Sequence, residues 1–360
     1  MLALAVACTS LDVPLSDPPA IGTVVDTGRP LADPAAPVDP DAAPVVTFAN
    51  PVATGTPDPH VSRHGDHVFL VYSPGDRILL RRADTLLGLG EAEERELWVP
   101  PPETLHSVDL WGPELHQVDG RAVIYYSATD ASFLGLSPDY RIWALRADAA
   151  DPWTATWTHE GPIVVPELDT VAQHPTVFGN GGYLAWTGRS DGPGLQGRLF
   201  VAPLLSALSV GPAVELASPV EAWETDVSSV LEAPAVVERD GRRVLVYAAS
   251  SCISAERALG ILEQDVGDSP LDPSAWTRRT DPWLLSAPSQ GTWALGQPGF
   301  VTSPDGVEDW LVYHAAESTL QGCGADRALH LNRVVWTSDG PVVDGPTGPA
   351  TAIPAPGGIE

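Results

Sequence analysis

The chain has 360 residues, 44% of them apolar, so it can bury the core of one large domain or of two ordinary ones. Its 19 basic and 47 acidic residues give a net charge of −28, which repels a phosphate backbone, so nucleic acid is excluded as a partner. All of the basic residues are arginines, which also excludes lysine-dependent chemistry such as a P-loop or a Schiff base. The 37 prolines and 33 glycines favour short strands joined by turns.

The N-terminal region has two parts. Residues 1–8 form an apolar run of small residues before Cys8, which is typical of the end of a bacterial lipoprotein signal, although the basic start and the full length of such a signal are missing. A chance apolar N-terminus is the alternative. With the signal, Cys8 would carry lipid, and the protein would be secreted or held at the surface or in the periplasm of a bacterium. Residues 9–46, rich in Pro, Ala and Asp, are expected to form a disordered linker.

Two further cysteines and the hydropathy of the chain bear on its environment. Cys252 and Cys323 could form one disulfide in an oxidising compartment, or they could be two buried free thiols. No segment reads as a membrane-spanning helix, so the lipid on Cys8 would be the only membrane anchor that the sequence predicts.

From residue 50 onward one pattern recurs five times: an apolar stretch, a turn with Gly or Asp, and a second apolar run with an aromatic residue. The copies begin at Val61, Leu115, Thr176, Ala235 and Phe300, and their aromatic residues are Tyr72, Tyr126, Trp186, Tyr247 and Tyr313. The aromatic residues are 54, 60, 61 and 66 positions apart, and each copy is typical of a β-hairpin. The repeat predicts an all-β fold, a five-bladed β-propeller over residues 47–350, followed by a tail at residues 351–360. Two stacked β-sandwich domains are the rival interpretation.

A polar residue precedes each hairpin, always with a proline within two positions. These residues are Asp58, Glu114, His174, Glu232 and Gln297. In a propeller they would converge on the central channel, because the innermost strand of each blade lines it. Two acidic groups that face each other there suit glycoside hydrolysis, in which one protonates the leaving oxygen and the other activates water. The plainer interpretation is that they are turn residues that cap strands.

Several sequence blocks in the same order resemble glycoside hydrolase family 43, over about Asn50 to Pro346. They are Asn50-Pro51 with Asp58-Pro59, the block Leu110-Trp111-Gly112-Pro113-Glu114-Leu115, Leu231-Glu232-Ala233-Pro234, Tyr313-His314-Ala315, and Gly322-Cys323-Gly324 with Arg327. The last two resemble the arabinofuranosidase-like branch of the family. The resemblance implies a five-bladed propeller that hydrolyses arabinose- or xylose-containing plant polysaccharides or oligosaccharides with inversion.

Within this resemblance, Asp58 corresponds to the general base and Glu232 to the general acid. Trp111, Glu114, His174, Gln297 and Arg327 are expected to line the sugar pocket or to tune the catalytic pKa values. No cofactor is required, although a calcium or sodium ion could lie on the propeller axis. A carbohydrate substrate and a monomeric chain complete the expectation.

Two positions depart from the pattern of the family. His174 stands where the family has a third carboxylate, and Gln297 stands where it has a central histidine. Asp169 could serve as a substitute carboxylate. The alternative functions are therefore a propeller that binds glycans without cleaving them, and a purely structural or protein-binding propeller.

Two other signals are set aside. Gly188-Arg189-Ser190-Asp191-Gly192 has the spacing of a nucleophile elbow, but Pro193-Gly194 follows where a helix is needed. His60, His64 and His67 have no recognised metal-ligand spacing and are interpreted as turn and surface residues.

Overall fold

The computed structural model describes residues 46–130, 139–166, 171–189, 196–254, 257–318 and 323–359. Regular structure within these ranges is β-strand, apart from four short 3₁₀ helices. The helices are η1 (Leu87–Gly90), η2 (Ala222–Glu224), η3 (Pro273–Ala275) and η4 (Pro288–Gln290). The predicted all-β class is confirmed. Cys8, the expected linker up to residue 45 and Asp169 lie outside the described residues.

Five antiparallel sheets form the blades, and each is built from one contiguous stretch of chain. Blade 1 contains β2 (His60–His64), β3 (His67–Tyr72), β4 (Ile78–Ala83) and β5 (Glu93–Trp98). Blade 2 contains β6 (Val108–Val118), β7 (Arg121–Thr129), β8 (Arg141–Ala147) and β9 (Trp157–Pro162). Blade 3 contains β10 (Ala172–Phe178), β11 (Tyr183–Arg189), β12 (Gly197–Ser206), β13 (Ser209–Val210) and β14 (Val214–Ala217). Blade 4 contains β15 (Leu231–Arg239), β16 (Arg242–Ala249), β17 (Ala258–Asp265) and β18 (Thr277–Arg278), and blade 5 contains β19 (Trp293–Thr302), β20 (Asp309–Ala316), β21 (Ala328–Thr337) and β22 (Gly340–Val343).

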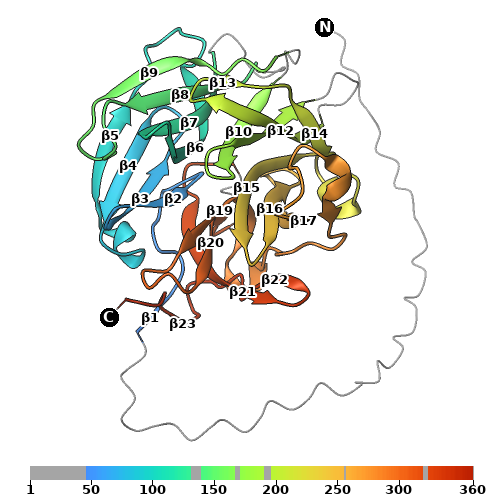
Figure 1. The fold of residues 1–360 in the computed structure, drawn as a ribbon. Helices are drawn as coiled ribbons and strands as arrows, with labels where there is room; N and C mark the ends of the chain where they lie inside the picture. Colours follow the sequence, from blue (N-terminus) through green and yellow to red (C-terminus); the bar gives the residue numbers. More distant parts are fainter. Residues whose placement is uncertain are drawn as a thin grey trace, which may run out of the picture. The chain divides into compact units, whose positions relative to one another are not determined.

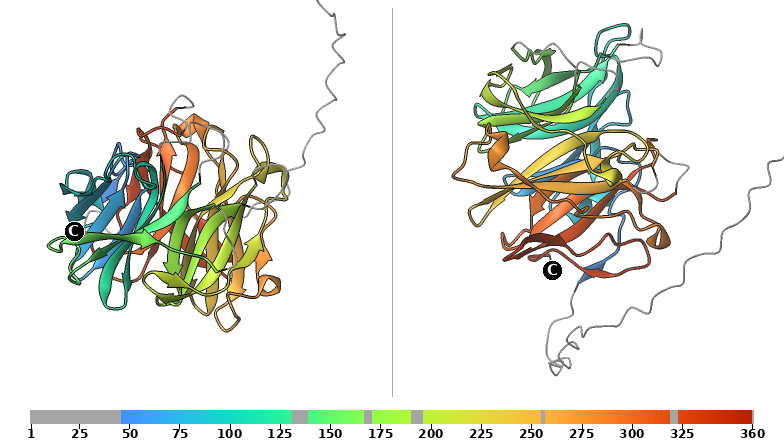
Figure 2. Two further views of the ribbon diagram at one scale, coloured as in Figure 1. Left: turned by 90° about the horizontal axis from the view of Figure 1, so that it is seen from above. Right: turned by 90° about the vertical axis from the view of Figure 1, so that its right-hand side faces the viewer.

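The blades are arranged in a ring and pack against their neighbours (Figures 1 and 2). A separate apolar cluster lies between each pair of adjacent blades, including the pair formed by blades 5 and 1. The repeated aromatic residues lie on the second strand of each blade, and all are at most 3% exposed. This arrangement confirms the five-bladed propeller and excludes two stacked sandwiches.

The two ends of the propeller are tied together next to blade 5. β1 (Thr47–Phe48) pairs with β23 (Ile353–Pro354), which lies in the segment expected above to be a tail. The buried Asn50 amide donates to the carbonyl of Leu331 at 2.8 Å and to the hydroxyl of Thr347 at 2.9 Å. Backbone hydrogen bonds also join residues 52–56, before β2, to Arg327 and Leu329 of blade 5. The ring is thus closed by this short ladder, by these backbone bonds and by side-chain contacts, although the strands of blades 1 and 5 form separate sheets.

A covalent link joins the adjacent blades 4 and 5. Cys252, in the loop after β16, forms a disulfide with Cys323, in the loop before β21, with a Cα–Cα distance of 5.1 Å. Of the two alternatives for these cysteines, the structure has the disulfide. It holds together two loops that reach the central pocket described below.

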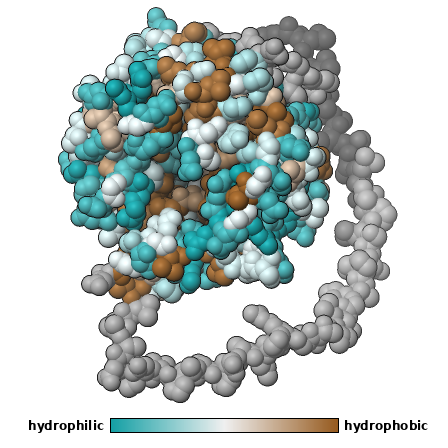
Figure 3. Space-filling model, viewed as in Figure 1, coloured by the Kyte–Doolittle hydropathy of each residue, from teal (hydrophilic) through white to brown (hydrophobic). Residues whose placement is uncertain are grey.

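The surface suits a strongly acidic chain. On the face shown in Figure 3, hydrophilic residues predominate and apolar residues lie between them in separate patches. Among the described residues, no helix has the length and apolar character needed to cross a membrane.

Candidate active site

The same backbone bend occurs at the inner edge of every blade. The five residues at the bend have positive φ angles of 51°, 53°, 50°, 52° and 44°, and each directly precedes a proline: Asp58, Gly112, His174, Ala233 and Gln297. In β6, β10, β15 and β19 the ladder register shifts at this point. Non-glycine residues rarely adopt such angles, and the strain they represent tends to collect at functional sites.

The sequence predicted that five polar residues occupy equivalent positions in the five blades, but the bend shows that only three of them do. Asp58, His174 and Gln297 occupy the bend itself, whereas the equivalent residues of blades 2 and 4 are Gly112 and Ala233. Glu232 comes one position before the bend and Glu114 two positions after it. The offset separates the two glutamates: Glu232 lines the central pocket, while Glu114 is not among the residues that line it.

The pocket on the channel axis has a volume of about 120 Å³. It is lined by Asp58, Trp111, His174, Glu232, Ala233, Cys252, Arg257, Gln297, His314, Cys323 and Arg327. Since one water needs only roughly 10–15 Å³ by the same measure, this volume holds several waters or a group about the size of one sugar ring. The structure thus brings together Asp58, Glu232 and four of the other predicted site residues, Trp111, His174, Gln297 and Arg327.

Asp58 is a buried anion with a cationic partner. Only 3% of it is exposed, and Nη1 of Arg327 donates to its Oδ1 at 2.5 Å. The backbone N–H of Asp58 donates to Nδ1 of His314 at 3.3 Å, and this nitrogen also lies 3.2 Å from Oδ1. Burial opposes ionisation, but Arg327 and the contact with His314 outweigh it and hold the pKa of Asp58 well below its usual range. Asp58 is therefore ionised at neutral pH.

Glu232 meets different groups through its two oxygens. Nη2 of Arg257 donates to Oε1, and Nε2 of His174 lies 3.9 Å from Oε2. Its side chain is 19% exposed, more than that of Asp58, so it can be reached from the pocket. The guanidinium of Arg257 is itself buried; burial together with the nearby charge of Arg327 lowers the pKa of Arg257 to about 9, against the opposing effect of Asp58.

His174 is held on three sides. Its backbone N–H donates to Oγ of Ser127 at 2.7 Å, its Nδ1 lies 3.0 Å from Oε1 of Gln297, and its ring stacks on Trp111 with centroids 6.4 Å apart. Trp111 in turn stacks on Tyr140 at 4.7 Å. The close fit extends to the backbone of the next blade, because a Cβ on Gly112 would lie 2.8 Å from Nδ1 of His174.

Sequence reasoning missed two basic side chains of the pocket, Arg257 and His314. His314 lies on β20 beside Asp58, and its block was recognised, but without a role. Arg257 follows Cys252 by five positions, just as Arg327 follows Cys323 by four, and each arginine meets one candidate catalytic carboxylate. The similar spacing after Cys252 and Cys323 is the sequence signal that could have identified Arg257 as the counterpart of Arg327.

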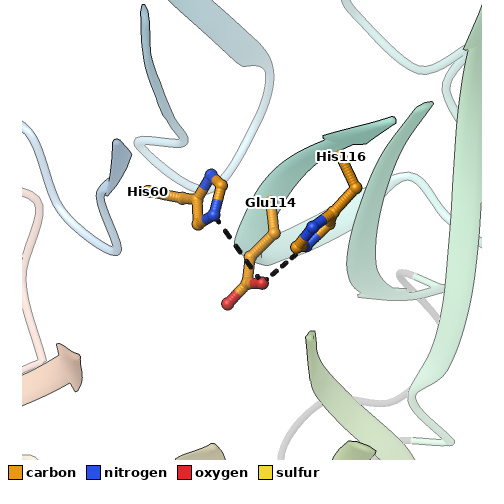
Figure 4. A group of neighbouring side chains, drawn as sticks. All are labelled: His60, Glu114 and His116. Carbon is orange, nitrogen blue, oxygen red and sulfur yellow. Dashed lines mark hydrogen bonds and ion pairs between the residues drawn. The ribbon is translucent and has the colours of Figure 1, made fainter. Parts of the chain in front are cut away.

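Glu114 lies in a second group of side chains, the histidine cluster, which consists of His60, Glu114 and His116 (Figure 4). Nε2 of His116 is 2.8 Å and Nε2 of His60 4.0 Å from Oε2 of Glu114. Burial raises the pKa of Glu114 to about 7, although His60 and a hydrogen bond from Thr176 act the other way. His60 lies in β2 with its side chain 14% exposed, so it is neither a turn residue nor a freely exposed one.

The histidine cluster has ligand types that bind metal ions, and its ligand atoms lie within 4.8 Å of one another. A metal-bound histidine offers the lone pair of one nitrogen to the ion and donates its other N–H to an acceptor. Here the backbone N–H of Leu115 donates to Nδ1 of His60 at 3.2 Å, so the proton of the neutral ring is on Nε2, which faces Glu114. One carboxylate also falls short of the oxygen ligands that calcium takes. The cluster therefore suits hydrogen bonding between Glu114 and the two histidines better than it suits binding of a metal ion.

Comparison with known proteins agrees with this geometry. Residues 48–342 match the family described as glycosyl hydrolases family 43. The chain belongs to glycoside hydrolase family 43. It is 33% identical to an extracellular exo-α-(1→5)-L-arabinofuranosidase of Streptomyces avermitilis and 34% identical to α-L-arabinofuranosidase 43 of Humicola insolens, in both cases over 81% of this chain.

Among solved structures, this family 43 chain resembles an α-L-arabinofuranosidase from Lactobacillus brevis. The TM-score is 0.76 and the identity 28%, over 87% of this chain and 98% of the other. A thermostable family 43 glycoside hydrolase with a TM-score of 0.69 and 22% identity has the same fold. The chain spans 63% of the length of each of the two curated relatives named above.

Proposed function

We propose that this chain is a glycosidase that removes a terminal pentosyl unit, foremost α-L-arabinofuranosyl, from plant polysaccharides or oligosaccharides. The observation that carries the proposal is the presence of two carboxylates, Asp58 and Glu232, in one pocket the size of a single sugar ring. The arabinofuranosidase names of the relatives favour arabinose over xylose. Since two Streptomyces relatives are named extracellular, we expect this protein to act outside the cell as well.

The proposed reaction follows the inverting scheme of two carboxylates on opposite sides of the sugar. Asp58, ionised because of Arg327, takes a proton from a water whose oxygen forms a bond to the anomeric carbon. The bond from this carbon to the leaving oxygen breaks, and that oxygen takes its electron pair and a proton from Glu232. Solvent then returns one proton from Asp58 to Glu232, so the overall change is the addition of one water. Side chains supply both acid and base, and the proposal requires no cofactor.

The other pocket residues would bind the sugar. Trp111 lines the pocket beside His174 and would contribute an apolar surface to sugar binding. Arg257 and Arg327 retain N–H donors that could reach sugar hydroxyls, because each uses only part of its guanidinium for its carboxylate.

One observation favours the alternative of a glycan-binding propeller without hydrolysis. The contact between Arg257 and Glu232 stabilises the carboxylate form of Glu232, whereas a general acid must carry a proton. This alternative keeps the pocket and its ligand but removes the reaction.

Hydrolysis of nitrophenyl α-L-arabinofuranoside and nitrophenyl β-D-xyloside tests the proposal. We expect the arabinoside to be cleaved faster, and Asp58→Asn and Glu232→Gln each to lose activity by about 10²–10⁴-fold, the usual contribution of a general acid or base. Glu114→Gln, outside the pocket, is the matched control and should change the rate little. Proton NMR of the first product formed shows whether the anomeric configuration is inverted. A folded protein that binds arabinosides but cleaves none of them would establish the alternative.

A further inference from the structure

The two oxygens of Glu232 are in unlike surroundings, and the difference determines where a proton can be. Oε1 accepts a hydrogen bond from Nη2 of Arg257, and a proton on this oxygen would be repelled by that donor. Oε2 faces Nε2 of His174 at 3.9 Å. If Glu232 is protonated, its proton is therefore on Oε2, the oxygen that faces the histidine.

The hydrogen bond on the other side of His174 sets the state of Nε2. Nδ1 lies 3.0 Å from Oε1 of Gln297, and an amide oxygen can only accept, so Nδ1 carries the proton of the neutral ring. Nε2 then offers a lone pair to Glu232. Burial keeps the ring neutral by lowering the pKa of His174, with Arg257 and Arg327 acting in the same direction and Asp58 and Gln297 in the other.

The ring is also fixed in place. His174 is 8% exposed, its backbone is bent at φ 50° and donates its N–H to Ser127, and its ring stacks on Trp111. A movement of about 1 Å would bring Oε2 of Glu232 within hydrogen-bond distance of Nε2. Such gaps commonly close when a substrate binds.

We infer that His174 is a positioning residue that holds the proton of Glu232 on Oε2, the oxygen not bonded to Arg257, with Gln297 fixing the tautomer that makes this interaction possible. The inference rests on the proposed function. Arg257 acts against His174, since it stabilises the carboxylate form through Oε1. The proton stays with Glu232 until the leaving oxygen takes it, and no bond to His174 forms or breaks.

The charged and titratable groups around this pair come from four blades. They are Asp58 before β2, Arg257 before β17, His314 on β20 and Arg327 before β21, in addition to Glu232 and His174 themselves. Of these, Arg257 is the one with a contact to Glu232, and Asp58 has its own partners in Arg327 and His314. The interaction of His174 with Glu232 can therefore be changed without replacing a group bonded to the base.

The test uses substrates that differ in their need for an acid. An alkyl α-L-arabinofuranoside has a leaving oxygen that must be protonated, whereas a dinitrophenyl α-L-arabinofuranoside has one that leaves as an anion. We expect His174→Asn to lower kcat/KM by about 10²-fold on the alkyl substrate and by less than about fivefold on the dinitrophenyl substrate. Asparagine suits the replacement because it tolerates the positive φ angle and cannot take up the proton. The alkaline limb of the pH profile should move to lower pH, because a hydrogen bond that favours the protonated acid is lost.

Two further variants complete the design. Gln297→Met removes the acceptor that fixes the tautomer, and it should show the same dependence on the leaving group with a smaller loss. His330→Asn makes the same replacement at another buried histidine, outside the pocket, and should show no dependence on the leaving group. Equal losses on both substrates in His174→Asn, with an unmoved alkaline limb, would overturn the inference and leave the proposed function standing.

A measurement that does not need turnover separates the two proposals. Carbon-13 NMR of labelled glutamate side chains, with the Glu232 signal assigned through Glu232→Gln, follows the titration of Glu232 directly. We expect its midpoint to be lower in His174→Asn than in the parent protein. An unchanged midpoint overturns the role of His174 even in an active enzyme, whereas a lowered midpoint in an inactive parent supports the interaction and overturns the proposed hydrolysis.

Discussion

Two carboxylates on the inner side of the ring, Asp58 and Glu114, are almost equally buried, at 3% and 1% exposed, yet their pKa values are shifted in opposite directions. Asp58 in the pocket has an arginine as its partner, and its pKa lies well below the usual range despite burial. Glu114 in the histidine cluster has two imidazoles, both of which burial keeps neutral at pH 7, and its own pKa rises to about 7. The partner, and not the depth of burial, decides whether a buried carboxylate is an anion.

The comparison also shows how the fold assigns these partners. The arginines of the pocket come from loops that the Cys252–Cys323 disulfide connects, while the histidines of the cluster come from two adjacent inner strands. The loops thus bring the positive charges of two arginines to the pocket, whereas the strands bring only neutral histidines to the cluster. A catalytic base must be ionised, so only the pocket suits the reaction.

The largest effect is expected when the pocket loses its cation. Arg327→Met leaves Asp58 as a buried anion without an arginine, and removal of one partner of a buried pair costs about 3–5 kcal/mol of unfolding free energy. Asp58→Asn combined with Arg327→Met removes both charges, and it should be more stable than Arg327→Met alone. Urea unfolding of the parent, both single variants and the double variant measures the coupling. A double variant less stable than Arg327→Met would show that the charge of Asp58 is not what makes the arginine necessary.

The second prediction concerns the pH dependence contributed by Glu114. Its pKa is about 7 in the folded protein and lower when the chain is unfolded, so its contribution to stability is fully present below the unfolded value and is lost as the pH rises through 7. Glu114→Gln removes this loss, so the stability of the variant relative to the parent should grow between about pH 4.5 and 7. The gain is roughly 3 kcal/mol at most, since one pKa unit corresponds to about 1.4 kcal/mol. Unfolding in urea at several pH values measures the difference.

This difference between parent and variant is needed because other groups titrate in the same range. The pKa of His60 is lowered to about 4 and that of His116 to about 3, so both destabilise the fold as the pH falls below the unfolded value of histidine. Asp58 has the opposite sign to Glu114, since its stabilising contribution is lost only in acid. A constant gap between Glu114→Gln and the parent from pH 5 to 8 would mean that Glu114 is ionised throughout and that the contrast with Asp58 is wrong.

The smallest effect concerns the bend itself. Gly112 lies within the inner strand β6 and Gly120 in the turn after it, with φ angles of 53° and 72°. A Cβ on Gly112 would lie 2.8 Å from His174, whereas a Cβ on Gly120 would meet nothing within 4 Å. Gly120→Ala should cost about 1 kcal/mol for its strained backbone. Gly112→Ala should lose the same stability and should also lose activity, because the new Cβ displaces His174. Thermal unfolding and arabinoside hydrolysis check both, and equal activity in the two variants would show that the position of His174 tolerates change.

The sequence predicted the fold well because the five repeats place an apolar hairpin at a regular spacing, and such hairpins form blades. It also placed Asp58, at the bend, and Glu232, directly before the bend, at the central channel, and both line the pocket. It misplaced Glu114, because this residue comes two positions after the bend, and the position directly before the bend in blade 2, equivalent to that of Glu232, is occupied by Trp111. Arg257 could not be found in this way, since its role depends on a contact between a loop and the inner strand of the same blade.

The pairing of β1 with β23 places the two ends of the ring side by side (Figure 1), while every blade is completed by its own segment. The chain could therefore begin at a different point of the ring without changing the arrangement of the blades. A circular permutant that joins residue 47 to residue 354 through a short linker and opens the chain in the turn at residues 266–272 keeps every strand in its sheet. Since this turn lies outside the pocket lining, the permuted ring keeps Asp58, Glu232 and both arginines in the same pocket, and the candidate site does not depend on where the chain begins.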